Sequence, residues 1–285
     1  MANSGVAFQG SNLWGTGFTL EPETAADLIR LDSRNRDVLF PYLSGRDVNE
    51  HPQHQPARWV INFFEWPRER AESYSDCFRI VEEEVKPGRM NIKRTRNRER
   101  WWIFGETRPG LYGAIKGADV VPVTVLHSPY GLPAMVSAQQ VFSHGLAVFA
   151  NSDWSHFGVL SSAVHTAWAV NRGSTLETRI RYTPTDVYET FPMPHYANAN
   201  VKLQFGELAR RLHNHRASLM TRSGLGLTKM YNKFHDPVEN DPDIKSLRGL
   251  HIELDTVSAT PTAGPTSTRI TITGKRRRGF DSQSA

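Results

Sequence analysis

The densest group of residues that could do chemistry is a basic stretch from Lys86 to Arg108, in which only Glu99 and Glu106 oppose the positive charge. Clustered Arg and Lys side chains neutralise phosphates and release counterions, so this stretch predicts salt-dependent contact with a nucleic-acid backbone. A solvated helix face would give the same pattern, and that alternative stays open. The candidate phosphate-contacting residues within the stretch are Arg89, Lys93, Arg94, Arg96, Arg98 and Arg100.

Two tryptophans, Trp101 and Trp102, follow the basic stretch directly. Adjacent tryptophans beside Arg can stack on bases, but large aromatic side chains more often anchor a hydrophobic core. We therefore expect both to be buried. A second basic run, Lys275–Arg278, lies near the C-terminus. It could contact DNA electrostatically, but we interpret it as solvated chain.

Several groups of residues match the letters of catalytic motifs without their context. His213-Asn214-His215 falls within an amphipathic helical pattern, and His51 and His54 have no third ligand nearby. The carboxylates of Asp236 and Asp243, followed by Lys245, lack the strand that a metal nuclease would provide. The sequence therefore predicts no catalytic residue and no metal site.

Composition limits the class of protein. The chain has 285 residues, a net charge of +5 and 39% hydrophobic residues, which is compatible with one large or two modest folded domains. The single cysteine, Cys77, excludes an intramolecular disulfide and favours a reducing compartment. The chain has no long apolar run and no secretion signal at its N-terminus, so we expect a cytoplasmic protein.

Strand patterns and helix patterns are mixed through the first two thirds of the chain, and helices dominate thereafter. This order predicts an α+β fold. We expect a first domain over 1–195, a helical segment over 196–255, and a disordered basic tail over 256–285. The predicted strands cover 59–64, 120–126, 134–140 and 145–150, with Pro122 favouring an edge or a bulge. One helix is predicted to begin near Glu21. Four others are predicted over 68–86, 155–170, 201–220 and 241–254.

Longer strings carry a more specific signal. In order along the chain they are DVLFPYLSGRDVN (Asp37–Asn49), ARWVINFFEWPRERAESYSDCFRIVEEEVKP (Ala57–Pro87), RERWWIFGETRPGLYGAIKG (Arg98–Gly117), QVFSHGLAVFA (Gln140–Ala150), RYTPTDVYETFPMP (Arg181–Pro194) and GLTKMYNKFHDP (Gly226–Pro237). Together they resemble the C-terminal part of MmeI-like restriction–modification enzymes and related adenine-N6 DNA methyltransferases. The resemblance covers roughly 6–254, and it corresponds to the target recognition domain and the start of a C-terminal helical region.

The resemblance implies the DNA-recognition portion of an enzyme without its catalytic portion. In that family an upstream domain binds S-adenosylmethionine and holds a flipped adenine with an Asn-Pro-Pro-aromatic motif. This chain contains neither that motif nor a glycine-rich cofactor strand. The expected partners are double-stranded DNA and a methyltransferase catalytic domain or chain. The expected cofactor, S-adenosylmethionine, belongs to that catalytic domain.

The resemblance also suggests where DNA would be read. Base contacts set the recognised sequence, and phosphate contacts set the register. The basic stretch, together with Lys116, would contact the DNA backbone. Polar side chains between the quoted strings would reach base edges: Thr124, His127, Ser128, Tyr130, Gln139 and Gln140. Polar loop chemistry alone would also explain these residues. For His144 we expect a hydrogen-bonded, buried histidine, and a DNA contact is the alternative.

Two further interpretations remain open. The family continues from Leu247–Asp255 into an ordered segment, whereas this chain runs into a tail rich in Ser, Thr, Pro and Gly. That departure is consistent with a truncated or frameshifted remnant without function. The basic character is also compatible with an RNA-binding module, although no RNA-recognition signature is present.

Overall fold

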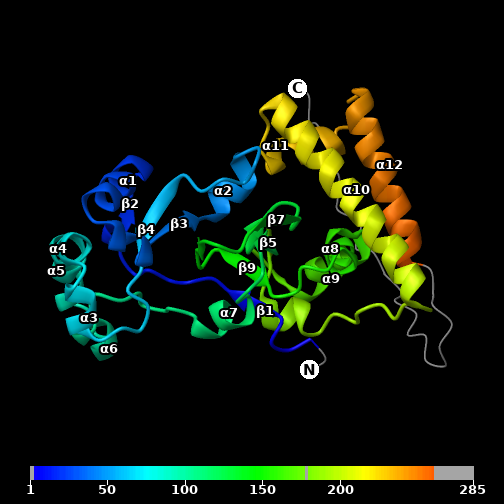
Figure 1. The fold of residues 1–285 in the computed structure, drawn as a ribbon. Helices are drawn as coiled ribbons and strands as arrows, with labels where there is room; N and C mark the ends of the chain where they lie inside the picture. Colours follow the sequence, from blue (N-terminus) through cyan, green and yellow to red (C-terminus); the bar gives the residue numbers. More distant parts are fainter. Residues whose placement is uncertain (1–2, 177–178, 260–285) are drawn as a thin grey trace, which may run out of the picture.

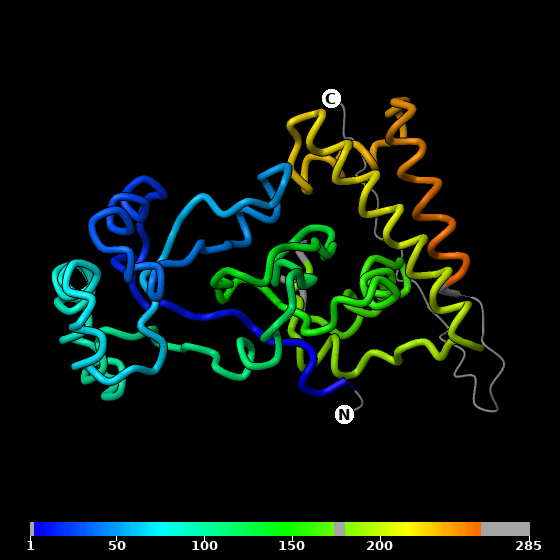
Figure 2. Tube along the Cα trace, in the orientation of Figure 1, coloured from blue at the N-terminus to red at the C-terminus, as the bar shows by residue number. Residues whose placement is uncertain are grey.

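The computed structural model describes residues 3–176 and 179–259. The chain forms three parts that succeed one another across Figure 1 and Figure 2: an N-terminal lobe of short helices and strands, a central region built on a sheet, and a set of long helices. Within the described residues, no helix is both long and apolar enough to cross a membrane.

The N-terminal lobe packs short helices around a four-stranded sheet of order β2-β4-β3-β8. The capping box at the start of α2 shows how its sequence sets local structure, because Ser44 and Asp47 satisfy each other's backbone N–H groups. The lobe contains β2 (Thr19–Leu20), α1 (Pro22–Leu31), β3 (Leu39–Leu43), α2 (Gly45–Glu50), β4 (Arg58–Ile61), α3 (Arg68–Glu72), α4 (Ser75–Glu84), α5 (Lys86–Met90) and α6 (Thr95–Glu99).

The central region is an antiparallel sheet of order β1-β9-β5-β7. Its elements are β1 (Ala7–Gln9), α7 (Pro109–Ala114), β5 (Val120–Val125), β7 (Pro133–Ser137) and β9 (Leu146–Phe149), while β8 (Val141–Phe142) pairs in parallel with β3 of the lobe. Strand β5 lies inside the sheet, but β9 pairs with it only from Val123 onward. Pro122 therefore lies where β5 has no hydrogen-bonding partner on the β9 side. A proline, which has no backbone N–H, is tolerated at such a position even in an interior strand.

A third, three-stranded antiparallel sheet has the order β10-β11-β6. It is formed by β6 (His127–Ser128), β10 (Ser174–Leu176) and β11 (Arg179–Arg181). Two helices, α8 (Trp154–Ser161) and α9 (Ala163–Arg172), precede β10, and a single π-helical turn, Pro184–Tyr188, comes after β11.

The long helices are α10 (Ala199–Ser223), α11 (Leu227–His235) and α12 (Pro242–Ala259). Asn198 caps the start of α10, and Gly224, with φ of 64°, ends it. Helix α10 packs on α8, and this approach requires Gly158, because a Cβ there would lie 2.8 Å from the Phe205 ring. Helix α11 returns to contact α2, so the helices touch both of the other parts (Figure 1).

The α+β fold expected from the sequence is confirmed, as is the burial of Trp101 and Trp102. Some boundaries differ. The helix expected over 68–86 is divided into α3 and α4 and is interrupted after Glu84, where Lys86-Pro87-Gly88 begins α5, since proline is tolerated in a first turn. The helix expected over 155–170 breaks at Ser162, and α11 was not predicted. The predicted tail from 256 onward lies mostly outside the described residues.

Candidate nucleic-acid interface

Arg89 lies inside the N-terminal lobe, with only 2% of its surface exposed. Its guanidinium donates hydrogen bonds to the main-chain oxygens of Trp14 (3.0 Å), Leu13 (2.7 Å) and Asn97 (3.2 Å). Burial lowers its pKa to about 10. This side chain ties the Leu13–Trp14 segment to helix α6 and cannot reach a phosphate in this structure, so we exclude it from the candidate DNA contacts.

Arg96 and Arg100 both form ion pairs with the carboxylate of Glu65. The Arg96 Nη2 lies 2.8 Å from a Glu65 carboxylate oxygen, and the Arg100 Nη1 lies 2.9 Å from the other. Burial acts to raise the pKa of Glu65, but a hydrogen bond from Thr107 and the two guanidinium charges outweigh it, so the pKa is lowered. The carboxylate thus offsets two of the cations counted in the sequence.

The remaining basic residues differ in their exposure and in their ion-pair and hydrogen-bond partners. Lys93 and Lys116 are exposed, and no ion pair joins either one to another described residue. Arg94 is half exposed, lies over the Trp14 ring and reaches Glu106 only at 3.8 Å. Arg98 is partly buried and donates to the Ile92 carbonyl oxygen. Lys93, Arg94 and Lys116 are therefore the basic residues best placed to contact phosphate.

Three of the expected base-reading residues serve the fold instead. Thr124 is 2% exposed and donates to the Leu132 carbonyl oxygen. Ser128 is buried, and its hydroxyl accepts from the backbone N–H groups of Tyr130 and Gly131. Gln140 is buried and donates to the Ser137 carbonyl oxygen. These side chains stabilise the turns at each end of the β5–β7 hairpin, and their burial is at odds with base contact.

The other three expected base-reading residues are at least partly exposed, but they do not lie close together. His127 is exposed on β6, just beyond one end of β5, whereas Gln139 is exposed beyond the other end of the hairpin. A strand of the length of β5 separates them by about 20 Å. Tyr130 is half-buried, since its hydroxyl donates to Asn232 and its ring stacks on His235. His127 and Gln139 thus belong to different edges of the molecule.

The structure identifies one residue that sequence reasoning missed. Arg181 on β11 lies directly opposite His127 in the antiparallel β11–β6 pair, and both side chains are exposed. Directly opposed residues have Cβ atoms about 5 Å apart. The alternation of buried Ile180, exposed Arg181 and buried Tyr182 was a signal in the sequence for this placement. Together Arg181 and His127 form an exposed pair of hydrogen-bonding side chains on one short sheet.

The histidines considered in the sequence differ in burial. His144 is exposed, which corrects the expectation that it is buried. His213 lies within α10 against Trp154 and Phe157, and burial lowers its pKa to about 3. His54 contacts the Val48 carbonyl oxygen, and burial lowers its pKa to about 4. Among residues 3–176 and 179–259, no three His, Cys, Asp or Glu side chains form a possible metal site.

Comparison with known proteins places this architecture in a family. The family model for the target recognition domain of MmeI matches residues 7–195. No curated protein matches the chain. A solved structure of the Type IIL restriction-modification enzyme MmeI in complex with DNA superposes with a TM-score of 0.68 at 18% identity, covering 94% of this chain and 34% of that one. The likeness establishes a shared fold, and this chain spans about a third of the length of the MmeI chain. Because the family model covers most of the chain, the protein belongs to the MmeI target recognition domain family.

Proposed function

We propose that this chain recognises a DNA sequence as the target recognition portion of an MmeI-type restriction–modification enzyme. The observation that carries the proposal is the family match over residues 7–195. The similar fold in a protein solved as a complex with DNA supports it. The net charge of +5 favours a polyanionic partner.

In this proposal the exposed Arg181–His127 pair reads base edges, and Gln139 is a second, separate candidate. An arginine can donate two hydrogen bonds to the N7 and O6 atoms of guanine, which is a common sequence-specific contact in the major groove. Lys93, Arg94 and Lys116 contact phosphates and set the register. Arg96 and Arg100 contribute less to phosphate binding, since Glu65 already neutralises part of their charge.

A second part of the proposal concerns the reaction for which the chain would position DNA. We propose that the chain positions duplex DNA for adenine-N6 methylation by a catalytic domain that binds S-adenosylmethionine. Within the described residues we find no group arranged for that chemistry. The support is the resemblance to MmeI-like enzymes carried by the sequence strings.

Selection of bound duplexes from a randomised DNA pool, at low and at near-physiological salt, tests the proposal. We expect one short motif to be enriched by the purified chain. Lys93→Ala and Lys116→Ala should weaken binding to all duplexes alike and reduce the salt dependence. Arg211→Ala, which removes a cation that faces Glu253 across α10 and α12, is the matched control.

The same experiment distinguishes the alternatives. Binding that is blind to sequence and disappears with salt would reduce the function to a basic surface. Stronger binding to RNA of the same length would favour an RNA-binding module. Absence of binding by a chain shown to be folded would favour a remnant, and repeating the selection with the catalytic domain added would separate a remnant from a strict need for that domain.

A further inference from the structure

Trp14 is an exposed aromatic residue between the N-terminal lobe and the central region. It is the most exposed of the seven tryptophans, with 41% of its surface accessible, whereas Trp101 and Trp102 are buried. It lies on one of two chain segments, 10–15 and 103–108, that join the lobe to the central region (Figure 1). A single exposed aromatic side chain is common on protein surfaces. The backbone that carries Trp14 is what sets it apart.

That backbone is strained and firmly held. Trp14 has a φ of 52°, in a region that a bulky residue rarely adopts. Its N–H donates to the Asn12 side chain at 3.2 Å, and its carbonyl oxygen accepts from buried Arg89 at 3.0 Å. Two main-chain hydrogen bonds of 3.0 Å join Asn12 to Glu106 on the neighbouring segment. Residues held in such conformations by their surroundings cluster at active sites and ligand clamps.

Gly105 fixes the direction of the indole. A Cβ at Gly105 would lie 2.6 Å from the Trp14 Cγ, 2.8 Å from its Cδ1 and 2.9 Å from its Cβ. These three similar distances place Gly105 over one face of the side chain and not at its edge. The backbone therefore supports the indole on one face, and a flat partner can stack only on the other.

The surroundings of the indole are positively charged. The Arg94 guanidinium lies over the ring, 5.4 Å from its centroid, and exposed Lys93 precedes it in the chain. The contact between Arg94 and Glu106 is long, at 3.8 Å, and Glu106 also pairs with Arg108. Arg94 can therefore move to a phosphate while a flat group takes its place on the ring. The same charge disfavours the cationic ligands that exposed aromatic rings otherwise bind.

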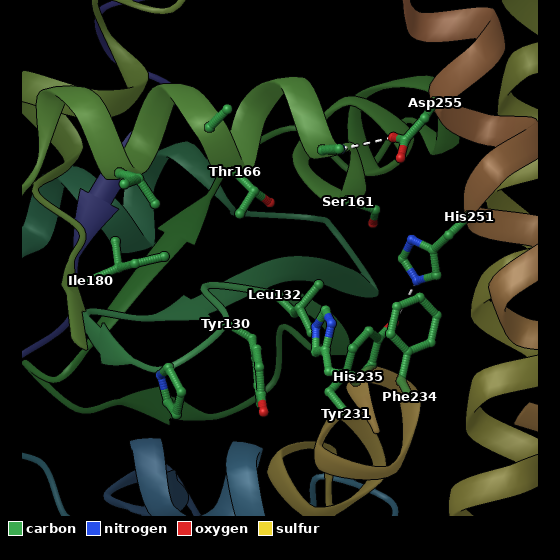
Figure 3. Close-up of a pocket in the computed structure, with 14 residues that line it drawn as sticks. Tyr130, Leu132, Ser161, Thr166, Ile180, Tyr231, Phe234, His235, His251 and Asp255 are labelled. Carbon is green, nitrogen blue, oxygen red and sulfur yellow. Dashed lines mark hydrogen bonds between the residues drawn. The ribbon is translucent and has the colours of Figure 1, made fainter. Parts of the chain in front are cut away.

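Two other aromatic surfaces lack this combination. Phe64 has a similar backbone, with a φ of 53° and its N–H bonded to the Asn62 side chain, but the rings of Phe40 and Trp66 pack against it. A cavity of about 550 Å³ among α9, α11 and α12 is lined by several aromatic side chains (Figure 3). Among the described residues, no Lys or Arg lines that cavity. Of these three surfaces, only the one at Trp14 joins an exposed ring to accessible cations.

We propose that Trp14 stacks on one unpaired base of the bound DNA, while Lys93 and Arg94 contact neighbouring phosphates. Every base has an aromatic face, so this contact is independent of sequence. Because Gly105 covers one face, the indole stacks on a single base and does not insert between two base pairs. The inference rests on the proposed function, since it takes the ligand to be DNA.

Binding of the full chain to two single-stranded probes of equal charge tests this inference. One probe is a short oligo-dT, and the other is an abasic chain of the same length. The two carry the same phosphates, so a purely electrostatic contact would bind them equally. We expect the oligo-dT to bind about tenfold more tightly, which is the effect expected of one stacked base.

The key variant is Trp14→Leu, which keeps an apolar side chain but removes the ring. It should abolish the preference for oligo-dT, whereas Trp14→Phe should retain part of it. Gly105→Ala should weaken the preference although the indole is still present, because the added Cβ displaces the ring. Lys93→Ala should weaken binding of both probes alike. Phe64→Leu, the matched control, removes an aromatic side chain from an equally strained position and should leave the preference unchanged.

Thermal unfolding of each variant checks that it is folded. The inference is overturned if the folded wild-type chain binds neither probe or binds the two equally, or if the preference survives in folded Trp14→Leu. An enriched duplex motif alongside equal binding of the two probes would overturn the stacking contact alone. A preference for oligo-dT without any enriched duplex motif would support the stacking contact and overturn the recognition of a sequence.

Discussion

The guanidinium of Arg89 lies 2.7 Å from the main-chain oxygen of Leu13, a residue 76 positions away in the chain. The same group also bonds the oxygens of Trp14 and Asn97. A residue that the sequence places in a basic, DNA-facing stretch is thus an internal cross-link of the N-terminal lobe. The positive charge of Arg89 therefore stabilises the fold and is not available to a binding partner.

Replacing Arg89 should therefore destabilise the lobe. Arg89→Ala would leave buried carbonyl oxygens without donors, and hydrogen bonds to charged groups each contribute about 1.5–3 kcal/mol. We expect a loss of about 3 kcal/mol or more in the free energy of unfolding, measured by urea denaturation. Exposed Lys93→Ala, a few residues away, should change it by less than about 0.5 kcal/mol. Equal denaturation midpoints for the two variants would contradict this role for Arg89.

Glu65 should make stability depend on pH at the acid end. Its pKa is lowered in the folded chain, so its contribution is fully present above the ordinary value of 4.5 and is lost as the pH falls below it. Because the side chain is 40% exposed, solvent screening limits the effect of Glu65→Gln to about 1 kcal/mol at pH 7. Urea denaturation should show a smaller difference in the free energy of unfolding between the wild-type chain and Glu65→Gln at pH 3 than at pH 7. An equal difference at both pH values would exclude the ion pairs as its source.

His156 should affect stability at milder pH. Its Nε2 lies 2.8 Å from the Tyr188 hydroxyl, and burial lowers its pKa to about 4. The unfolded chain takes up this proton near pH 6.5, so stability present above pH 6.5 falls as the pH drops towards 4, by about 1.4 kcal/mol per pH unit. His156→Gln should reduce that slope between pH 6 and 5, measured by urea denaturation. The same change at exposed His195 is the control, and equal slopes for the two variants would disprove the assignment.

Arg181 and Thr124 should separate base reading from folding. If Arg181 contacts a base edge, Arg181→Ala should lose about 1–3 kcal/mol of discrimination at one position of the recognised motif. Thr124→Val removes the hydrogen bond to Leu132, so it should cost about 1 kcal/mol of stability and leave the motif unchanged. Competition binding with single-base variants of the selected motif measures both. An altered motif in Thr124→Val, or an unaltered one in Arg181→Ala, would reverse the assignment.

The sequence by itself determined the features that depend on local patterns. The α+β class, the burial of Trp101 and Trp102, and the helix over most of 201–220 result from periodicity and side-chain size, which act over a few residues. Family membership was also available, because it rests on strings of residues read in order.

Only the tertiary structure decided which polar side chains face solvent. Arg89, Thr124 and Gln140 satisfy distant or buried main-chain groups, and their partners cannot be known before the chain has folded. The opposition of Arg181 and His127 needs strand pairing across more than 50 residues. Burial and hydrogen-bond partners are properties of the packed molecule, so residue type alone could not assign these roles.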